Sequence, residues 1–153
     1  MLDSLRGILR RLRPAELDEL GLEAAVRSLA SRCAARTGLQ CAVEVTGDLA
    51  GLGPSVDMAV YRVAQEALSN VERHACARQA RLQLRRLGEV LELRIEDDGC
   101  GFAPDRPSRG LGLLGASERA AQLGGELSTG PSPLGGAALC LWVPVWPVAE
   151  GAR

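Results

Sequence analysis

The sequence predicts a single α+β domain in which amphipathic helices pack against a β-sheet as two layers. Three observations support this prediction. The chain has 153 residues, 46% of them hydrophobic and 24% charged, which suits one domain of common size with a continuous core. Residues 60–74 carry apolar side chains at helical spacing. Residues 39–46 and 89–97 instead alternate between apolar and polar side chains, as half-buried strands do.

The composition narrows the classes of function. A formal net charge of −1 gives no reason to expect nucleic acid or anionic lipid as a partner. The five cysteines are odd in number and lack CxxC spacing, which argues against a disulfide framework and a zinc site and predicts free thiols in a reducing cytosol. The longest apolar run, residues 137–149, is shorter than the roughly 20 residues of a membrane span, so we expect a cytoplasmic domain.

The first part of the chain predicts two helices and a strand. Residues 1–13 have apolar side chains at helical spacing and are expected to end a helix, which Pro14 interrupts within a short polar joint. A second helix is expected at residues 21–36, with Gly38 as its stop. The first strand follows at residues 39–46.

The central helix has two different faces. Its expected ends are an N-cap at Ser55 or Asp57 and a last residue near His74. Its apolar arc consists of Val60, Val63, Ala64, Ala67, Leu68 and Val71. Glu66, Asn70 and Arg73 lie with Arg62 on a neighbouring arc, and a carboxylate, a carboxamide and a guanidinium at i, i+4 and i+7 can converge on one ligand, such as a metal bound to a polyanion. The alternative is an ordinary helix with a solvated outer face.

Two further strands, residues 78–87 and 89–97, are expected around a tight turn. In the second strand an aliphatic inner row ends in Asp97. A buried carboxylate at this position needs a partner, whereas a carboxylate that begins a turn points to water, and the stretch itself allows both interpretations. Gly99 and Gly101 follow, and glycines two residues apart let the backbone approach a ligand closely.

The last third combines a glycine-rich segment with two short strands. Residues 103–109 are proline-rich and lack periodicity, which predicts a loop, and the glycine-rich residues 110–115 then open onto a helix that stops at residues 124–125. Such glycine loops expose backbone N–H groups that suit a phosphate chain, although the spacing matches neither the P-loop nor the Rossmann fingerprint. The final strands are expected at residues 126–129 and 137–145.

Three stretches stand in a fixed order along the chain. They are YRVAQEALSN at residues 61–70 with Arg73-His74-Ala75, DDGCGF at residues 97–102, and GLGL at residues 110–113 with Ser117-Glu118-Arg119 and Gly124-Gly125. These stretches resemble the N, G1 and G2 boxes of the catalytic ATP-binding domain of two-component sensor histidine kinases, whose ATPase superfamily includes gyrase, mismatch-repair proteins and heat-shock chaperones. Residues 12–22 resemble the junction that enters this domain in the nitrate- and desaturase-sensor subfamily.

The resemblance implies an architecture as well as an activity. The implied fold is a Bergerat-type α/β two-layer sandwich, with a mixed and mainly antiparallel sheet and helices packed on one face. Residues 1–13 would end a dimerisation-domain helix, residues 14–147 would form the ATP-binding domain, and residues 148–153 would be a disordered tail. The full-length protein would be a homodimer and could be a membrane-bound sensor with this domain in the cytoplasm, whereas this chain alone would be a monomer.

The resemblance also implies roles for individual residues. Asn70 would ligate a Mg²⁺ ion that bridges the ATP phosphates, and Glu66 would be the catalytic group near the attacking nucleophile; Mg²⁺ prefers oxygen ligands and keeps several waters. Arg73 and His74 would hold the phosphates, and Asp97 would accept a hydrogen bond from the adenine amino group. The other implied ATP-binding residues are Gly99, Gly101, Phe102, Gly136 and the lid residues Arg109, Gly110, Leu111, Gly112 and Leu113.

Two departures from the family pattern concern adenine and the phosphate acceptor. The family often has a threonine after the late glycine pair, where this chain has Ala137, which predicts somewhat weaker adenine binding. Histidine kinases transfer the γ-phosphoryl group to a histidine on a dimerisation domain and then to an aspartate of a response regulator. The sole histidine here, His74, lies inside the N box and is a poor acceptor. Alternatives are a superfamily ATPase that dimerises on nucleotide binding and an anti-sigma-type serine protein kinase.

Overall fold

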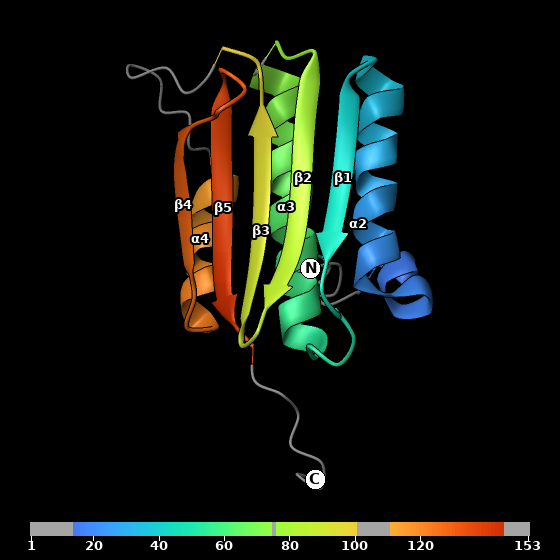
Figure 1. Cartoon of the computed structure of the whole chain (residues 1–153), viewed down its shortest axis with the longest axis vertical. Helices are drawn as coiled ribbons and strands as arrows, with labels where there is room; N and C mark the ends of the chain where they lie inside the picture. The colour runs from blue at the N-terminus through green and yellow to red at the C-terminus, as the bar shows by residue number, and fades with distance from the viewer. Residues whose placement is uncertain (1–13, 75, 101–110, 146–153) are drawn as a thin grey trace, which may run out of the picture.

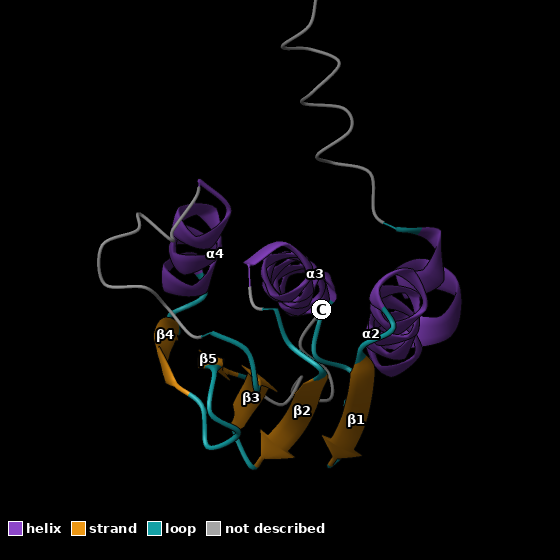
Figure 2. Ribbon diagram, turned by 90° about the horizontal axis from the view of Figure 1, so that it is seen from above, coloured by secondary structure: helices purple, strands orange, loops and turns teal. Residues whose placement is uncertain are grey.

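Five strands form one open sheet, and helices cover one of its faces (Figures 1 and 2). This arrangement comes from a computed structural model that describes residues 14–74, 76–100 and 111–145. The described helices are α2 (Ala15–Thr37), α3 (Pro54–His74) and α4 (Leu111–Gln122). The described strands are β1 (Gln40–Thr46), β2 (Gln79–Leu87), β3 (Val90–Asp97), β4 (Glu126–Pro131) and β5 (Ala137–Pro144).

The strand order is β1-β2-β3-β5-β4, and only β1 and β2 run parallel to each other. The β2–β3, β3–β5 and β5–β4 pairs are antiparallel. In Figure 2 all three helices lie on the same side of the sheet, with α3 between α2 and α4. The predicted two-layer fold with a mixed, mainly antiparallel sheet is therefore confirmed.

The core lies between α3 and the inner rows of the strands. The six apolar residues predicted for the inner arc of α3 are each at most 8% exposed. They meet inward-facing leucines that are fully buried, namely Leu82, Leu84, Leu91, Leu93 and Leu141. Because each buried leucine contributes about 1.5–3 kcal/mol relative to an exposed one, this layer is the main source of stability and holds α3 rigidly over the sheet.

The start of α2 differs from the prediction. The helix begins at Ala15 directly after Pro14, whereas a non-helical joint was expected up to Gly21. Gly21 interrupts the helix with φ 86° and ψ 174°, so that two helical segments meet there at a kink. Leu17 is buried in the core, and the Glu16 carboxylate accepts a hydrogen bond from Ser28 Oγ at 3.1 Å. This tertiary burial stabilises helical geometry where local spacing alone indicated a break.

Two other helices also begin earlier than predicted. The first residue of α3 is Pro54, whereas an N-cap was expected at Ser55 or Asp57. Proline is favoured at the first helical position, because the N–H that it lacks would have no partner within the helix there. The glycine-rich stretch expected as a loop up to Gly115 is helical from Leu111 onwards. Helical glycine costs about 1 kcal/mol, but the buried residues that follow, chiefly Ala116, fix α4 against the core.

The remaining strand predictions agree with the structure to within two residues. Cys33, Cys41, Cys76 and Cys140 are free thiols, as predicted. No helix among the described residues is long and apolar enough to cross a membrane. The predictions for residues 1–13, 103–110 and 148–153 lie outside the described residues.

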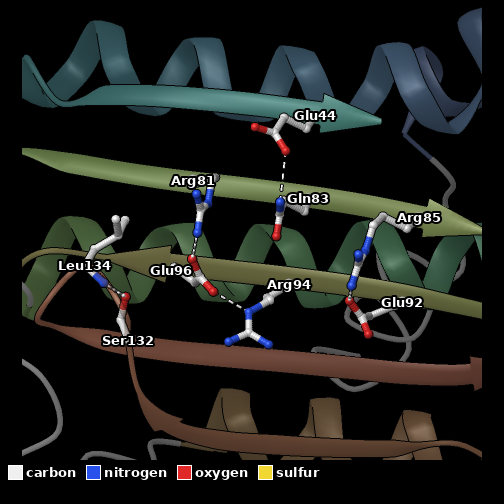
Figure 3. Close-up of polar contacts among 9 residues, drawn as sticks. All are labelled: Glu44, Arg81, Gln83, Arg85, Glu92, Arg94, Glu96, Ser132 and Leu134. Atoms are coloured by element: carbon white, nitrogen blue, oxygen red, sulfur yellow. Dashed lines mark hydrogen bonds and ion pairs between the residues drawn. The ribbon is translucent and has the colours of Figure 1, made fainter. Parts of the chain in front are cut away.

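The face of the sheet opposite the helices carries a ladder of ion pairs (Figure 3). Glu96 lies at its centre and is only 2% exposed. Its carboxylate accepts a hydrogen bond from Arg81 Nη2 at 2.5 Å and another from Arg94 Nε. Burial by itself raises the pKa of Glu96, but the hydrogen bonds from Arg94 and Arg81 outweigh burial and hold that pKa below its usual range.

Replacing Glu96 with glutamine should lower the free energy of unfolding at pH 7 by about 1–2 kcal/mol, because glutamine is neutral and offers the two arginines one acceptor oxygen instead of two, while the arginines stay partly hydrated. The folded-state pKa of Glu96 is depressed, so its contribution is present above the unfolded value of about 4.3 and is lost as the pH falls through the folded value. Urea unfolding from pH 7 to pH 3 measures both effects. Glu92→Gln is the matched control, since Glu92 pairs with Arg85 but is more exposed; an equal response of the two variants would contradict the role given to burial.

Candidate functional site

The polar arc of α3 brings three side chains together. Arg73 Nη2 lies 3.5 Å from Glu66 Oε1 and 3.3 Å from Asn70 Oδ1. Arg73 Nε also lies 3.4 Å from the carbonyl oxygen of Ser69. The predicted convergence of Glu66, Asn70 and Arg73 is therefore present in the structure. Arg62 is not part of this cluster, since its guanidinium donates to the Gln65 side chain at 3.0 Å.

The two oxygens of this cluster fit a divalent cation that is shared with a polyanion. A carboxylate oxygen of Glu66 and the carboxamide oxygen of Asn70 meet at one nitrogen of the positively charged Arg73. Hard oxygen ligands are those that Mg²⁺ prefers, and Mg²⁺ commonly takes only one or two from the protein. Among the described residues no group of three histidine, cysteine, aspartate or glutamate side chains could hold a metal ion. Phosphate oxygens and waters would have to complete the coordination.

Asp97 ends β3 as a buried carboxylate that is only 4% exposed. Its Oδ1 accepts hydrogen bonds from the backbone N–H groups of Gly99 at 2.9 Å and Ala137 at 3.2 Å. Within the part of the chain that the structure describes, no donor contacts its Oδ2. Asp97 thus begins a turn and is buried as well, which combines the two interpretations that the sequence left open. One carboxylate oxygen is fixed by the fold, and the other is left as an acceptor for an external donor.

Gly136 packs directly against Asp97. Its N–H donates to the Asp97 carbonyl oxygen at 3.0 Å. A Cβ atom at Gly136 would lie 2.1 Å from Asp97 Oδ1 and 2.5 Å from the Gly99 nitrogen, far inside van der Waals contact. Only glycine therefore lets the start of β5 approach the turn after β3 closely enough to hold the carboxylate.

Two contributions to the site were missed from the sequence. Ala137 was considered only for the hydroxyl that it lacks, but its backbone N–H is one of the two donors to the Asp97 carboxylate. Asp98 was not singled out, although its Oδ1 accepts from the backbone N–H groups of Arg78 at 2.8 Å and Gln79 at 2.9 Å. Both hydrogen bonds lower the pKa of Asp98, and the one from Gln79 has the larger effect. An aspartate directly after a strand was the only available signal, and it is common to many turns.

The two parts of the site lie at the same end of the sheet. The chain leaves α3 at His74 and enters β2 at Gln79, whose carbonyl oxygen accepts a hydrogen bond from the Asp98 N–H at 3.2 Å. The C-terminal end of α3, which carries Asn70 and Arg73, is thereby placed near the end of β3, which carries Asp97. Figure 1 shows α3 and β3 running side by side to this end.

The structure describes only some of the other predicted site residues. Gly99 lies in the turn after β3 and donates to Asp97. Leu111, Gly112 and Leu113, which were expected in a lid loop, belong instead to the first turn of α4, because the helix starts at Leu111. The side chain of His74 lies outside the described part of the chain, as do Gly101, Phe102, Arg109 and Gly110.

Sequence comparison places this chain in a known family. Residues 55–147 match the histidine kinase-, DNA gyrase B- and HSP90-like ATPases, and the chain belongs to this family. It is 39% identical over 127 residues to the signal transduction histidine-protein kinase/phosphatase UhpB of Salmonella typhimurium, with 82% of this chain and 25% of UhpB covered. It is 36% identical over 135 residues to the sensor histidine kinase MctS of Rhizobium johnstonii, with 86% of this chain and 29% of MctS covered.

Structural comparison agrees with this assignment. The crystal structure of the ATP-binding domain of PrrB from Mycobacterium tuberculosis matches with a TM-score of 0.64 and 26% sequence identity, over 80% of this chain and 93% of that domain. The chain spans between a quarter and a third of the length of UhpB and MctS. The predicted resemblance to the ATP-binding domain of sensor histidine kinases is confirmed.

Proposed function

We propose that this chain binds Mg·ATP and transfers the γ-phosphoryl group to a histidine on the dimerisation domain of the same sensor kinase, in the cytoplasm. A response regulator would then receive the phosphoryl group on an aspartate. One observation carries the proposal most directly: the buried Asp97 has one oxygen held by two backbone N–H groups and the other left as an acceptor. Such a fixed acceptor suits the amino group of adenine.

The adenine end of the site is formed by the turn after β3 and the start of β5. Asp97 Oδ2 accepts from the adenine amino group, while Gly99 and Gly136 keep side chains out of the space beside the base. Both donors to Asp97 Oδ1 are backbone groups, so the carboxylate is already oriented before adenine arrives. This preorganisation lowers the entropic cost of binding and favours adenine over a base with a carbonyl at the same place.

The phosphate end is formed by the polar arc of α3. Asn70 supplies an oxygen to Mg²⁺, Arg73 and His74 hold the phosphates, and Glu66 assists the attacking histidine. The metal, when bound, neutralises charge on the phosphates. Residues 109–113 close over the phosphates, although Leu111 to Leu113 do so as the beginning of α4 rather than as a loop. The phosphate accepting histidine belongs to another domain, because the only histidine of the sequence, His74, ends α3 within the site itself.

Replacing Asn70 with aspartate should weaken Mg²⁺-dependent binding of a fluorescent ATP analogue about tenfold, a change of about 1.4 kcal/mol. The added charge repels the phosphates and binds Arg73 more tightly. Glu66→Gln should lower the rate of phosphoryl transfer to a separately supplied phosphoacceptor domain about tenfold and lower the affinity less, because Glu66 acts chiefly in the transition state.

Gln65→Glu is the matched control for these variants. It adds a negative charge next to Glu66, but the Gln65 side chain contacts Arg62 and lies outside the cluster. Unchanged Mg²⁺-dependent binding of the Asn70 variant would remove Asn70 from the site. Equal losses of affinity and rate in the Glu66 variant would contradict its assignment to the transfer step.

A further inference from the structure

We propose that Arg73 occupies the position of the divalent cation and keeps it closed until the phosphates of a nucleotide draw the guanidinium away. Metal binding would then depend on nucleotide binding through a competition within one helix face. The inference rests on the proposed function and adds to it an order of events, in which the metal enters with the nucleotide or after it.

The first step is the position of the guanidinium. Nη2 of Arg73 contacts Glu66 Oε1 and Asn70 Oδ1, the two oxygens that are the candidate cation ligands on this face of α3. Its Nε contacts the carbonyl oxygen of Ser69, which orients the guanidinium over the helix. The side chain of Arg73 therefore satisfies both oxygens at once.

The second step is mutual exclusion. A Mg²⁺ ion needs its oxygen ligands at about 2.0–2.1 Å, and the lone pairs that point at Arg73 would have to turn to the metal. A guanidinium and a divalent cation on the same two oxygens would also repel each other strongly at such short range. One cation must leave before the other binds.

The third step is that Arg73 is held weakly enough to move. Its contacts with Glu66 and Asn70 are long, at 3.5 and 3.3 Å, and its side chain is 56% exposed. By contrast Arg36 and Glu72, which join α2 to α3, form an ion pair at 2.6 Å. Exposed pairs with long contacts contribute little free energy, whereas phosphate offers a guanidinium two parallel charge-assisted hydrogen bonds. A triphosphate therefore provides a better partner for Arg73 and frees the oxygens for the metal.

The proposal is tested by titrating Mn²⁺ into the ¹⁵N-labelled chain without nucleotide and following paramagnetic broadening of the Asn70 side-chain amide. In Arg73→Ala this signal should broaden to half intensity at about tenfold lower Mn²⁺ than in the wild type, equivalent to about 1.4 kcal/mol. Arg73→Lys keeps the charge and should stay close to the wild type. Arg62→Ala, on the same helix but bonded to Gln65, is the matched control and should not change the titration.

Equal Mn²⁺ titrations of the wild type and Arg73→Ala would overturn the proposal, as would the same gain in Arg62→Ala. The dispersion of the amide signals of each variant reports whether that variant is folded. Since the Arg73 side chain is exposed, we expect its replacement to leave the fold intact. A parallel titration with a fluorescent ATP analogue and Mg²⁺ separates this inference from the proposed function. If the wild type binds the analogue but Arg73→Ala gains no Mn²⁺ binding, only the competition fails. If the wild type does not bind the analogue, the proposed function fails whatever the Mn²⁺ result.

Discussion

Replacing Gly136 with alanine should abolish measurable binding of an ATP analogue and lower the free energy of unfolding by about 1–3 kcal/mol, the usual cost of forcing extra atoms into a packed site. The new methyl group would lie 2.1 Å from Asp97 Oδ1 and 2.7 Å from the Asp97 carbonyl oxygen. These atoms belong to a turn tied to two strands and have no room to move. The start of β5 must therefore shift outwards, which breaks the hydrogen bonds from the Gly136 and Ala137 N–H groups.

Gly130→Ala is the matched control, because Gly130 also lies in a strand at this side of the sheet and a Cβ there would meet no atom within 4 Å. Urea unfolding gives the change in stability, and fluorescence titration gives the change in affinity. If both glycine variants behave alike, the close approach of β5 to Asp97 does not support the site.

The second large effect is expected at Asp97 itself. Asp97→Asn preserves the shape of the side chain and an oxygen for the Gly99 and Ala137 N–H groups. It places an amide NH₂ where the carboxylate offered Oδ2, so a donor faces the adenine amino group. The loss of a charge-assisted hydrogen bond in a buried site should weaken ATP binding by about 1.5–3 kcal/mol, or roughly 10- to 150-fold.

Calorimetric titrations with ATP and GTP test this assignment. The wild type should prefer ATP, since guanine presents a carbonyl oxygen to Asp97, and Asp97→Asn should reduce or reverse the preference. Asp98→Asn is the control: Asp98 holds the start of β2 through the N–H groups of Arg78 and Gln79, so its variant should lose stability without changing the preference. Equal affinity of the wild type for both nucleotides would remove Asp97 from adenine recognition.

The two faces of α3 could be predicted from the sequence because helical spacing determines both which residues are buried and which polar groups meet. The inner arc is buried as a unit, and Glu66, Asn70 and Arg73 lie within hydrogen-bonding range of one another. Strand positions were also predictable, since the alternation of side chains reports which face is buried. In both cases a local periodicity carries the information.

Helix starts were less predictable, because they depend on contacts beyond the local sequence. Pro54 begins α3 although Ser55 and Asp57 are better N-cap residues, and Leu111 begins α4 despite the glycines that follow. The parallel pairing of β1 with β2 could likewise not be predicted from the alternation of apolar and polar residues, since a strand buries the same face whether its neighbour runs parallel or antiparallel. Tertiary packing decides these features.

The donors to Asp97 show a different limit. Ala137 serves the site through its backbone N–H, and every residue except proline has this group. Its side chain therefore gives no signal of its role. The informative residue is the neighbour Gly136, whose missing Cβ permits the contact, but the sequence shows only that a glycine is present and not what it approaches.

The single parallel pair of the sheet also bears on the order in which the chain folds. Strands β2, β3, β5 and β4 form a continuous antiparallel unit, and β2 and β3 are joined by a short turn. The pairing of β1 with β2 is parallel, which is slightly less stable per residue than antiparallel pairing, and β1 lies at the edge of the sheet with no fully buried side chain. We therefore expect β1 and α2 to dock last and to open first in native-state hydrogen exchange, while Asp97 and Gly136 remain within the slowest-exchanging part of the molecule.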